Sequence, residues 1–229
     1  MNNQFERLVP LYGADALETL KNKTVAVIGL GGVGAYAVEG LIRMGVGTLV
    51  LMDADVVQPN NLNRLIIATH DSVGQNKTEL LQARALAINP SARVHIHTKR
   101  FTEATQSELF DYPLDFIYDA IDSLKDKVTL IESALEKGIP FLSTTGQGNR
   151  WNLENVCIKD LFDTQYDPLA RKLRKQLRDK GITRGVSVVH SSEPPLSGAS
   201  LDFIASNPFV PATAGLRAAQ HICSKLMEE

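Results

Sequence analysis

The chain has 229 residues and a formal net charge of −2, with 44% hydrophobic and 22% charged residues, an ordinary composition for a globular protein with one sizeable domain. The small net charge excludes a global field that would draw the whole protein onto nucleic acid, so any basic surface must be local. Two distant cysteines, Cys157 and Cys223, argue against a four-cysteine zinc site and fit a reducing cytoplasm, and we expect neither a signal peptide nor membrane insertion.

The first predicted elements are a strand, a tight turn and a helix. A β-branched run at 25–28 stops at Gly29, and Gly29, Gly31 and Gly34 form GxGxxG before a helical stretch at 33–44. Glycines let the backbone turn tightly and approach a ligand, and the helix N-terminus attracts an anion. The motif therefore predicts a phosphate-binding turn; the alternative is a turn that only packs the helix on the sheet.

The second predicted strand, 48–52, ends at Asp53. A carboxylate at this spacing after GxGxxG holds the ribose hydroxyls of a dinucleotide or an adenylate. Asp53 therefore strengthens the prediction of a nucleotide site.

Strands and helices alternate along the first 150 residues. The predicted strands are 25–28, 48–52, 93–97, 115–119 and 139–143, and the predicted helices are 33–44, 77–88, 102–110 and 123–137. This rhythm predicts an α/β, Rossmann-like, mostly parallel and doubly wound sheet, with ligands beyond the carboxyl ends of the strands. At that edge we expect the Gly29 turn, Asp53, the loop 54–64, and residues 119–122 and 144–148.

Two cations, Arg64 and Lys77, follow the predicted phosphate turn. A guanidinium and an ammonium together suit a triphosphate better than the less charged pyrophosphate of NAD. The alternative is that both are solvated surface charges.

Asp122 lies just past the fourth predicted strand, where it is free to coordinate Mg²⁺ on bound phosphates. Alternatively, Asp122 is an N-cap for the helix that begins near Ser123. We expect Asp119 to be structural, closing the strand.

The second half of the chain has a different rhythm. We expect a strand at 155–158, a basic helix at 167–180, a strand at 186–190, a Ser/Pro/Gly-rich loop at 191–208 and a helix at 212–227. Residues 171–184 contain seven Lys or Arg and one acid, and Leu169, Leu173 and Leu177 recur at four-residue spacing, so we expect them to face the core. Such a helix suits a phosphate backbone; a solvated helix face is the alternative, and a membrane-surface helix is disfavoured because the apolar face lacks Trp and Phe.

Four motifs in order, GLGGVG, DADVVQPNNLNR, VGQNK and YDAIDS, resemble the adenylating domain of the ubiquitin-activating, MoeB/ThiF/HesA superfamily. The later segments YDPLARKLR, KGITRGVSVVHSSE and SNPFVPATAGLRAAQHI resemble the tRNA threonylcarbamoyladenosine dehydratases. The resemblance covers nearly the whole chain. It implies one MoeB/ThiF-like domain over 1–229, with a nucleotide-binding half at 1–150. The C-terminal extension, 151–229, would hold the substrate and dimer contacts, the basic helix and the long loop.

The resemblance also implies an activity. Such enzymes are dimeric, use ATP and Mg²⁺, and activate the threonyl carboxylate of threonylcarbamoyladenosine in tRNA as an acyl adenylate, which then cyclises with loss of AMP. The implied catalytic set is Arg7, which would cross the dimer to the partner's phosphates, with Arg64, Lys77 and Asp122. The implied ATP contacts are Gly29, Gly31, Gly32, Gly34, Asp53 (ribose), Asn61, Arg64 and Lys77, with Asp122 on Mg²⁺. The implied tRNA contacts are Arg171, Arg174, Lys175 and Arg178.

Two departures narrow the activity. The chain lacks the paired CxxC zinc motifs of the protein-modifier-activating relatives, and Val188 stands where some dehydratases carry a cysteine, so we do not expect thioester transfer. The first rival function is adenylation of the C-terminal glycine of a ubiquitin-like sulfur carrier. The second is an NAD-sensing Rossmann module without chemistry. The sequence leaves open whether a sulfur-transfer protein binds.

Overall fold

A seven-stranded sheet organises the computed structural model, which describes residues 4–196 and 204–228. The strand order is β3-β2-β1-β4-β5-β7-β6, and every neighbouring pair is parallel except β6 and β7. The strands are β1 (Thr24–Ile28), β2 (Thr48–Met52), β3 (Arg93–His97), β4 (Phe116–Asp119), β5 (Phe141–Thr144), β6 (Val156–Asp160) and β7 (Ser187–Ser191). The predicted mostly parallel, doubly wound sheet is confirmed, and the second half of the chain adds β7 and β6 to it.

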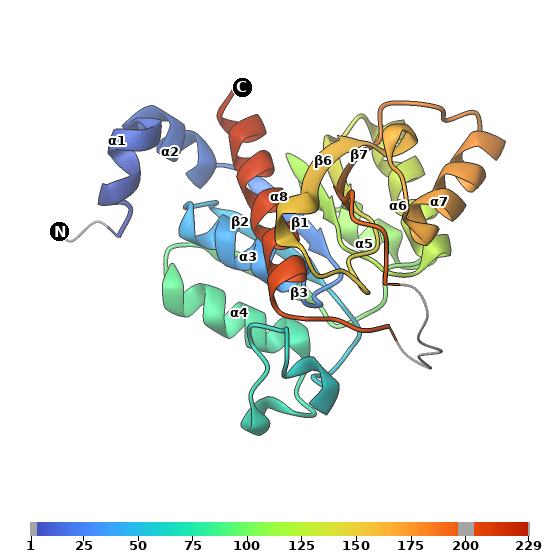
Figure 1. Ribbon diagram of the computed structural model, residues 1–229. Coiled ribbons are helices and arrows are strands. Elements are labelled where there is room, and N and C mark those ends of the chain that lie inside the picture. Colours follow the sequence, from blue (N-terminus) through green and yellow to red (C-terminus); the bar gives the residue numbers. More distant parts are fainter. Residues whose placement is uncertain (1–3, 197–203, 229) are drawn as a thin grey trace.

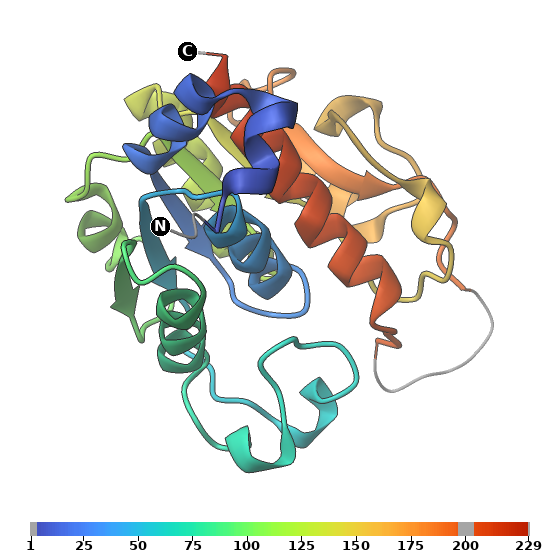
Figure 2. The ribbon, with the colours of Figure 1, turned by 90° about the vertical axis from the view of Figure 1, so that its left-hand side faces the viewer.

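Helices cover both faces of the sheet (Figure 1). The helices α3, α4 and α8 pack on one face and α5 and α6 on the other, while α7 packs on α6 and the short N-terminal helix α2 lies beside α8 (Figure 2). The α-helices are α1 (Val9–Tyr12), α2 (Ala14–Lys21), α3 (Gly34–Arg43), α4 (Lys77–Ile88), α5 (Gln106–Phe110), α6 (Leu124–Lys137), α7 (Pro168–Asp179) and α8 (Phe209–Met227). Single 3-10 turns are η1 (Glu6–Leu8), η2 (Pro59–Asn61), η3 (His70–Ser72), η4 (Leu153–Asn155) and η5 (Leu161–Asp163).

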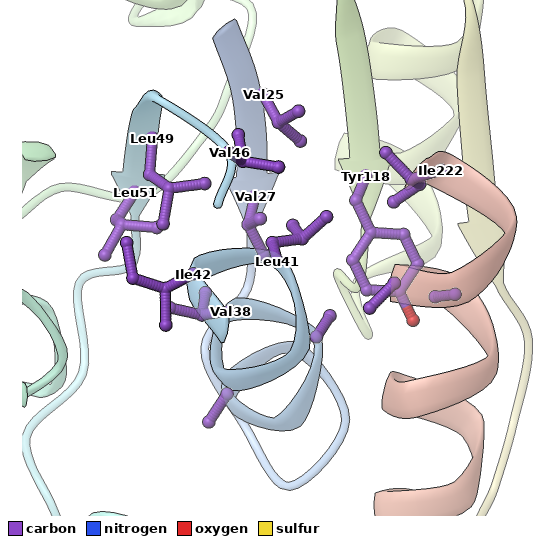
Figure 3. Packing of buried hydrophobic residues seen from close by; sticks show 14 of the residues in the cluster. Val25, Val27, Val38, Leu41, Ile42, Val46, Leu49, Leu51, Tyr118 and Ile222 are labelled. Atoms are coloured by element: carbon purple, nitrogen blue, oxygen red, sulfur yellow. The ribbon is translucent and has the colours of Figure 1, made fainter. Parts of the chain in front are cut away.

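The strand β1 is buried on both faces, which explains its continuous apolar run. Val25 and Val27 point into the cluster shared with α3 and α8 (Figure 3), and Ala26 and Ile28 point into the cluster shared with α5 and α6. Each fully buried Val or Ile side chain contributes about 1.5–3 kcal/mol of transfer free energy. This two-sided core fixes the strand whose carboxyl end carries Gly29.

Two predicted helices have different bounds in the structure. The helix expected at 102–110 is only α5, because the Thr105 hydroxyl donates to Arg100 O at 2.7 Å and accepts from Thr102 N at 2.9 Å, and so closes a turn instead. The helix expected at 212–227 begins earlier, at Phe209, because Asn207 Oδ1 accepts from the first two backbone N–H groups. Of the long loop expected at 191–208, residues 197–203 lie outside the described residues.

The long segment between β2 and α4 projects from the body of the molecule at the edge where the strands end (Figure 2). Its two ends are joined, since Val57 N donates to Gln75 O at 2.9 Å and Lys77 N donates to Asp55 O at 3.1 Å. Across the described ranges, none of the helices has the length and apolarity that crossing a membrane requires.

Candidate active site

The carboxyl ends of β1, β2 and β4 border a cavity of about 500 Å³, which we call the first cavity. Its walls come from the Gly29–Gly34 turn, from residues 53–55 after β2, from residues 120–122 after β4, and from Lys77 at the start of α4. This is the edge at which the sequence predicts a ligand.

Two glycines of the turn are required by close packing. Gly29 has a φ of +88°, and a Cβ there would lie 2.6 Å from Ala120 O; a Cβ on Gly34 would lie 1.9 Å from Gly29 O. Gly31 differs, because a Cβ there would meet no atom within 4 Å. The turn therefore packs α3 against the sheet through Gly29 and Gly34, and it keeps the backbone open to a ligand at Gly31.

Asp53 is held in place at the wall of the first cavity. Its Oδ2 accepts from Leu30 N at 2.6 Å, and its Oδ1 accepts from Asp55 N at 2.7 Å. Burial raises the pKa of Asp53, against the opposing charge of Lys77. A carboxylate has about four lone-pair sites, so it keeps acceptor capacity for two hydroxyls.

The two predicted phosphate cations lie on different walls. The Lys77 side chain is 9% exposed, and its Nζ lies 2.8 Å from Asp55 Oδ2 in the first cavity. Arg64 Nη1 donates to Asn60 O at 2.7 Å, and the stem of this side chain packs against Gly32, where a Cβ would be 3.2 Å from Arg64 Cγ. Arg64 lines a second, adjoining cavity. Neither cation has the environment of a free surface charge.

Asn61 and Arg7 line neither described cavity. Asn61 Oδ1 accepts from Gln58 N at 3.1 Å and its Nδ2 donates to Asn60 Oδ1 at 2.9 Å, so this amide closes η2. Arg7 is exposed in η1. Within one chain, therefore, the structure does not bring these two residues to the nucleotide edge.

Asp122 is exposed and borders both cavities. The N-cap position of α6 belongs to Ser123, so the N-cap alternative for Asp122 is wrong. In the described part of the chain the Asp122 carboxylate forms no hydrogen bond or ion pair. Its neighbour Asp119 is structural, as predicted: its Oδ2 lies 2.8 Å from Lys127 Nζ, and its Oδ1 accepts from Ile121 N at 3.0 Å.

The second cavity has a volume of about 620 Å³ and lies beyond the carboxyl end of β5. It shares Gly32, Val33 and residues 120–122 with the first cavity, so the two are adjoining. The sequence predicts residues 144–148 at this edge, and these line the second cavity together with Arg150, Asp167 and Lys172.

Arg100, Phe101, Arg150 and Asp167 are cavity residues that the sequence does not predict as site residues. Arg100 and Phe101 line the first cavity and follow β3, so the rule of strand carboxyl ends could have found them. Arg150 and Asp167 line the second cavity. Arg150 follows the 144–148 turn, and Asp167 is the N-cap of α7. Neither directly follows a strand, so the rule of strand carboxyl ends does not predict them.

The basic helix α7 begins at the second cavity, which Leu169 and Lys172 line. Its inner face carries the buried Leu173 and Leu177, whereas Leu169, expected in the core, is only half-buried. Arg171, Lys175 and Arg178 are exposed, and the Arg178 guanidinium lies 5.3 Å from the ring centre of Phe162. These cations form an open charged surface.

Arg174 has a different environment from the other α7 cations. Its Nη1 donates to Leu161 O at 3.2 Å and to Thr164 O at 3.0 Å, and burial lowers the pKa of its guanidinium. Arg174 therefore ties α7 to the η5 turn through the hydrogen bonds of its Nη1.

Comparison with known proteins identifies the family. The ThiF family model matches residues 3–227. The chain belongs to the ThiF family. It is 38% identical to a tRNA threonylcarbamoyladenosine dehydratase of Bacillus subtilis, over 100% of this chain and 96% of that protein, and 36% identical to the enzyme of the same name from Escherichia coli, over 80% and 71%. Within the ThiF family, it belongs with these dehydratases.

Solved structures agree with this membership. The E. coli tRNA N6-threonylcarbamoyladenosine dehydratase TcdA in complex with AMP superposes with a TM-score of 0.94 at 34% identity, covering 98% of this chain and 94% of that one. The same enzyme in complex with ATP gives a TM-score of 0.92 at 33% identity and the same coverage. E. coli MccB, at 16% identity and a TM-score of 0.69, shares the fold.

Proposed function

We propose that this chain is an ATP-dependent enzyme that cyclises threonylcarbamoyladenosine in tRNA through an acyl adenylate. The observation that carries the proposal is the pair of adjoining cavities, which meet at Gly32 and Asp122. One has the glycine turn and lysine that suit a nucleotide, and the other has room for an acyl substrate. The dehydratase relatives and the TcdA complexes with ATP and AMP support the same assignment.

The proposed reaction is between ATP in the first cavity and the threonyl group of the substrate in the second. The threonyl carboxylate attacks the α-phosphorus of ATP, forming a C–O–P linkage and releasing pyrophosphate. An atom of the substrate's own carbamoyl group then attacks the activated carbonyl carbon, AMP leaves with its bonding pair, and a ureido N–H group loses its proton. The net change in the base is the loss of one water. Because the attacking group belongs to the substrate, no protein nucleophile is needed, and holding the two ends together supplies up to about 7–11 kcal/mol in ideal cases.

Positive potential must offset the repulsion between a carboxylate and a phosphate. We assign this role to Lys77, to Arg64 and to the N-terminus of α3, and we assign the ribose to Asp53. Lys77 pairs with Asp55 in the structure, so phosphate binding would draw its ammonium away from that carboxylate. The glycines at 29, 31, 32 and 34 would line the phosphates, and Asn61 would reach them only by giving up its contacts in η2.

Asp122 fits a magnesium ion better than a structural role. Its carboxylate is exposed, unpaired within the described residues and placed where the cavities meet. Mg²⁺ is commonly held by one or two carboxylates together with substrate phosphates and waters. There the ion would neutralise phosphate charge.

We further propose the partners and the assembly. The exposed cations of α7 would bind the tRNA backbone beside the second cavity. The protein would be a cytoplasmic two-fold dimer in which Arg7 reaches the partner's phosphates. Residues 1–150 would hold the nucleotide, and residues 151–229 would form the substrate side together with residues 144–150. A sulfur-transfer partner stays a prediction of the family resemblance.

Pyrophosphate release separates this function from its rivals. With ATP and Mg²⁺, we expect release with tRNA that contains threonylcarbamoyladenosine, and none with the same tRNA lacking the modification. Release with a ubiquitin-like sulfur carrier alone would favour the first rival. Tight NAD binding without any release would favour the second.

A further inference from the structure

Three buried side chains in the second cavity have polar atoms without a hydrogen-bond partner in the described part of the chain. Gln147, Arg150 and Asp167 are 7%, 4% and 3% exposed, and all three line the cavity. Gln147 Oε1, Arg150 Nε and Nη1, and Asp167 Oδ2 form no hydrogen bond with any residue that the structure describes. Buried polar groups in folded proteins are nearly always paired, so a cluster of four unpaired atoms at one cavity indicates a missing ligand.

The partnered atoms of the same side chains hold them in place. Asp167 Oδ1 accepts from two backbone N–H groups in the first turn of α7, at 2.8 and 3.1 Å. Arg150 Nη2 donates to a backbone carbonyl at 3.3 Å, and Gln147 Nε2 donates to backbone carbonyls at 3.3 and 3.4 Å. Each side chain is therefore held by hydrogen bonds from some of its polar atoms, and its remaining polar atoms are left for a ligand.

The unpaired atoms define the ligand's chemistry. Arg150 supplies donors, whereas Asp167 Oδ2 and Gln147 Oε1 supply acceptors. A polyphosphate carries acceptors only, so it would leave the two acceptors unpaired and would be repelled by Asp167. A ureido group, –NH–CO–NH–, carries a strong acceptor oxygen between two N–H donors. The ureido oxygen therefore matches the donors of Arg150, and the ureido N–H groups match the acceptors of Asp167 and Gln147.

We propose that Gln147, Arg150 and Asp167 recognise the ureido group that joins threonine to the adenine of the substrate, an assignment that rests on the proposed function. Arg150 donates to the ureido oxygen, and Asp167 Oδ2 and Gln147 Oε1 accept from the ureido N–H groups. The threonyl carboxylate stays free to react where the two cavities meet. Recognition of the ureido group would then distinguish the modified base from unmodified adenosine.

The test uses the full chain and a single reporter. Trp151, the only tryptophan of the chain, follows Arg150 directly and is 71% exposed, so its fluorescence can report ligand binding at this cavity. The probe is the free nucleoside N6-threonylcarbamoyladenosine, with adenosine as the comparison. Asp167→Asn keeps an oxygen for the α7 cap and replaces the free acceptor by a donor. Asp179→Asn, an exposed acid at the other end of α7, is the matched control.

We expect Asp167→Asn to weaken nucleoside binding roughly 10- to 100-fold, as for loss of a hydrogen bond to a charged group. The KM for modified tRNA should rise, while ATP affinity stays unchanged and Asp179→Asn behaves as wild type. Unchanged nucleoside affinity and KM in Asp167→Asn would overturn the proposal, and the unpaired atoms would then be satisfied by water.

A measurement on the wild-type chain keeps the test valid if Asp167→Asn does not fold. N-carbamoylthreonine and N-acetylthreonine share the carboxylate and the hydroxyl, but the second has a methyl group in place of the terminal NH₂. Recognition of the ureido group predicts that N-carbamoylthreonine displaces the nucleoside at the lower concentration, and equal displacement contradicts it. If the wild type converts no modified tRNA, the proposed function itself fails. If it converts the tRNA but prefers neither the modified nucleoside over adenosine nor N-carbamoylthreonine over N-acetylthreonine, only the ureido assignment fails.

Discussion

Lys127 Nζ lies 2.8 Å from Asp119 Oδ2, although both side chains are fully buried. Ser143 Oγ donates to the same carboxylate oxygen at 2.6 Å and accepts from Lys127 at 3.0 Å. The other oxygen, Asp119 Oδ1, accepts from the backbone N–H of Ile121. The buried pair thus sets the path of the 120–122 segment, which places Asp122 where the two cavities meet.

Removing Lys127 should therefore be costly. Lys127→Met would leave Asp119 charged, buried and unpaired by a cation, and breaking such a pair costs about 3–5 kcal/mol of unfolding free energy. Denaturant unfolding measures this. Lys125→Met, at an exposed position of the same helix, is the control and should change stability by less than about 0.5 kcal/mol. Equal stability of the two variants would show that the pair is not a structural requirement.

His190 should make stability fall in mild acid. Burial lowers the pKa of this imidazole from its ordinary 6.5 to about 4, and its buried Nδ1 has no hydrogen-bond partner among the described residues. Between these pH values the imidazole binds a proton in the unfolded chain but not in the folded chain, so lowering the pH favours unfolding. Above pH 6.5 His190 is neutral in both states and does not change the free energy of unfolding with pH. The loss amounts to about 3 kcal/mol at most.

His190→Gln removes that titration from both states. Denaturant unfolding between pH 7 and pH 4 (a window that spans the two pKa values) should give a shallower loss of stability in the variant than in the wild type. The nearby charges of Asp167, Arg150, Lys159 and Arg174 remain in both proteins, so the difference in slope isolates His190. Parallel curves would contradict the lowered pKa.

Some of this architecture follows from the sequence alone. The Gly29 turn, Asp53 and Lys77 were predictable because strand ends and glycines mark the ligand edge of a parallel sheet. Asn61 and Arg174 show the limit of that reasoning: spacing places a residue near the site, but the chain's own backbone takes up much of its hydrogen bonding. Arg150 could be identified only in the three-dimensional structure, because no local sequence pattern predicts that a charged side chain is buried.

Assembly is tested by complementation. If Arg7 acts on the partner's phosphates, Arg7→Ala and Lys77→Ala protomers should each be inactive alone and should recover activity when mixed, because some hybrid sites carry both residues. The measurement is turnover of modified tRNA after subunit exchange. The absence of recovery, with exchange demonstrated by mixed labelling, would place Arg7 outside the partner's site.

The α7 cations are tested through salt dependence. Replacing Arg171, Lys175 and Arg178 by Gln should weaken tRNA binding across sequences and reduce the log–log salt slope by about 0.7–0.9 for each lost phosphate contact. Arg174 is kept because it ties α7 to η5. ATP affinity should not change.

A control triple removes equal charge elsewhere. Lys21, Lys99 and Lys125 are exposed and line neither the first nor the second cavity. Their replacement by Gln should leave the slope close to that of the wild type. If the α7 triple and this control triple have the same slope, α7 is a solvated helix face and the tRNA lies elsewhere.

The central claim is that the chain removes one water from threonylcarbamoyladenosine in tRNA at the expense of ATP. Its most direct test is mass spectrometry of nucleosides from modified tRNA after incubation with the enzyme, ATP and Mg²⁺. We predict an ATP-dependent product lighter by one water, with one AMP formed per product, and a strongly reduced yield with Lys77→Ala. A modified base of unchanged mass, with active nucleotide binding, would contradict the account.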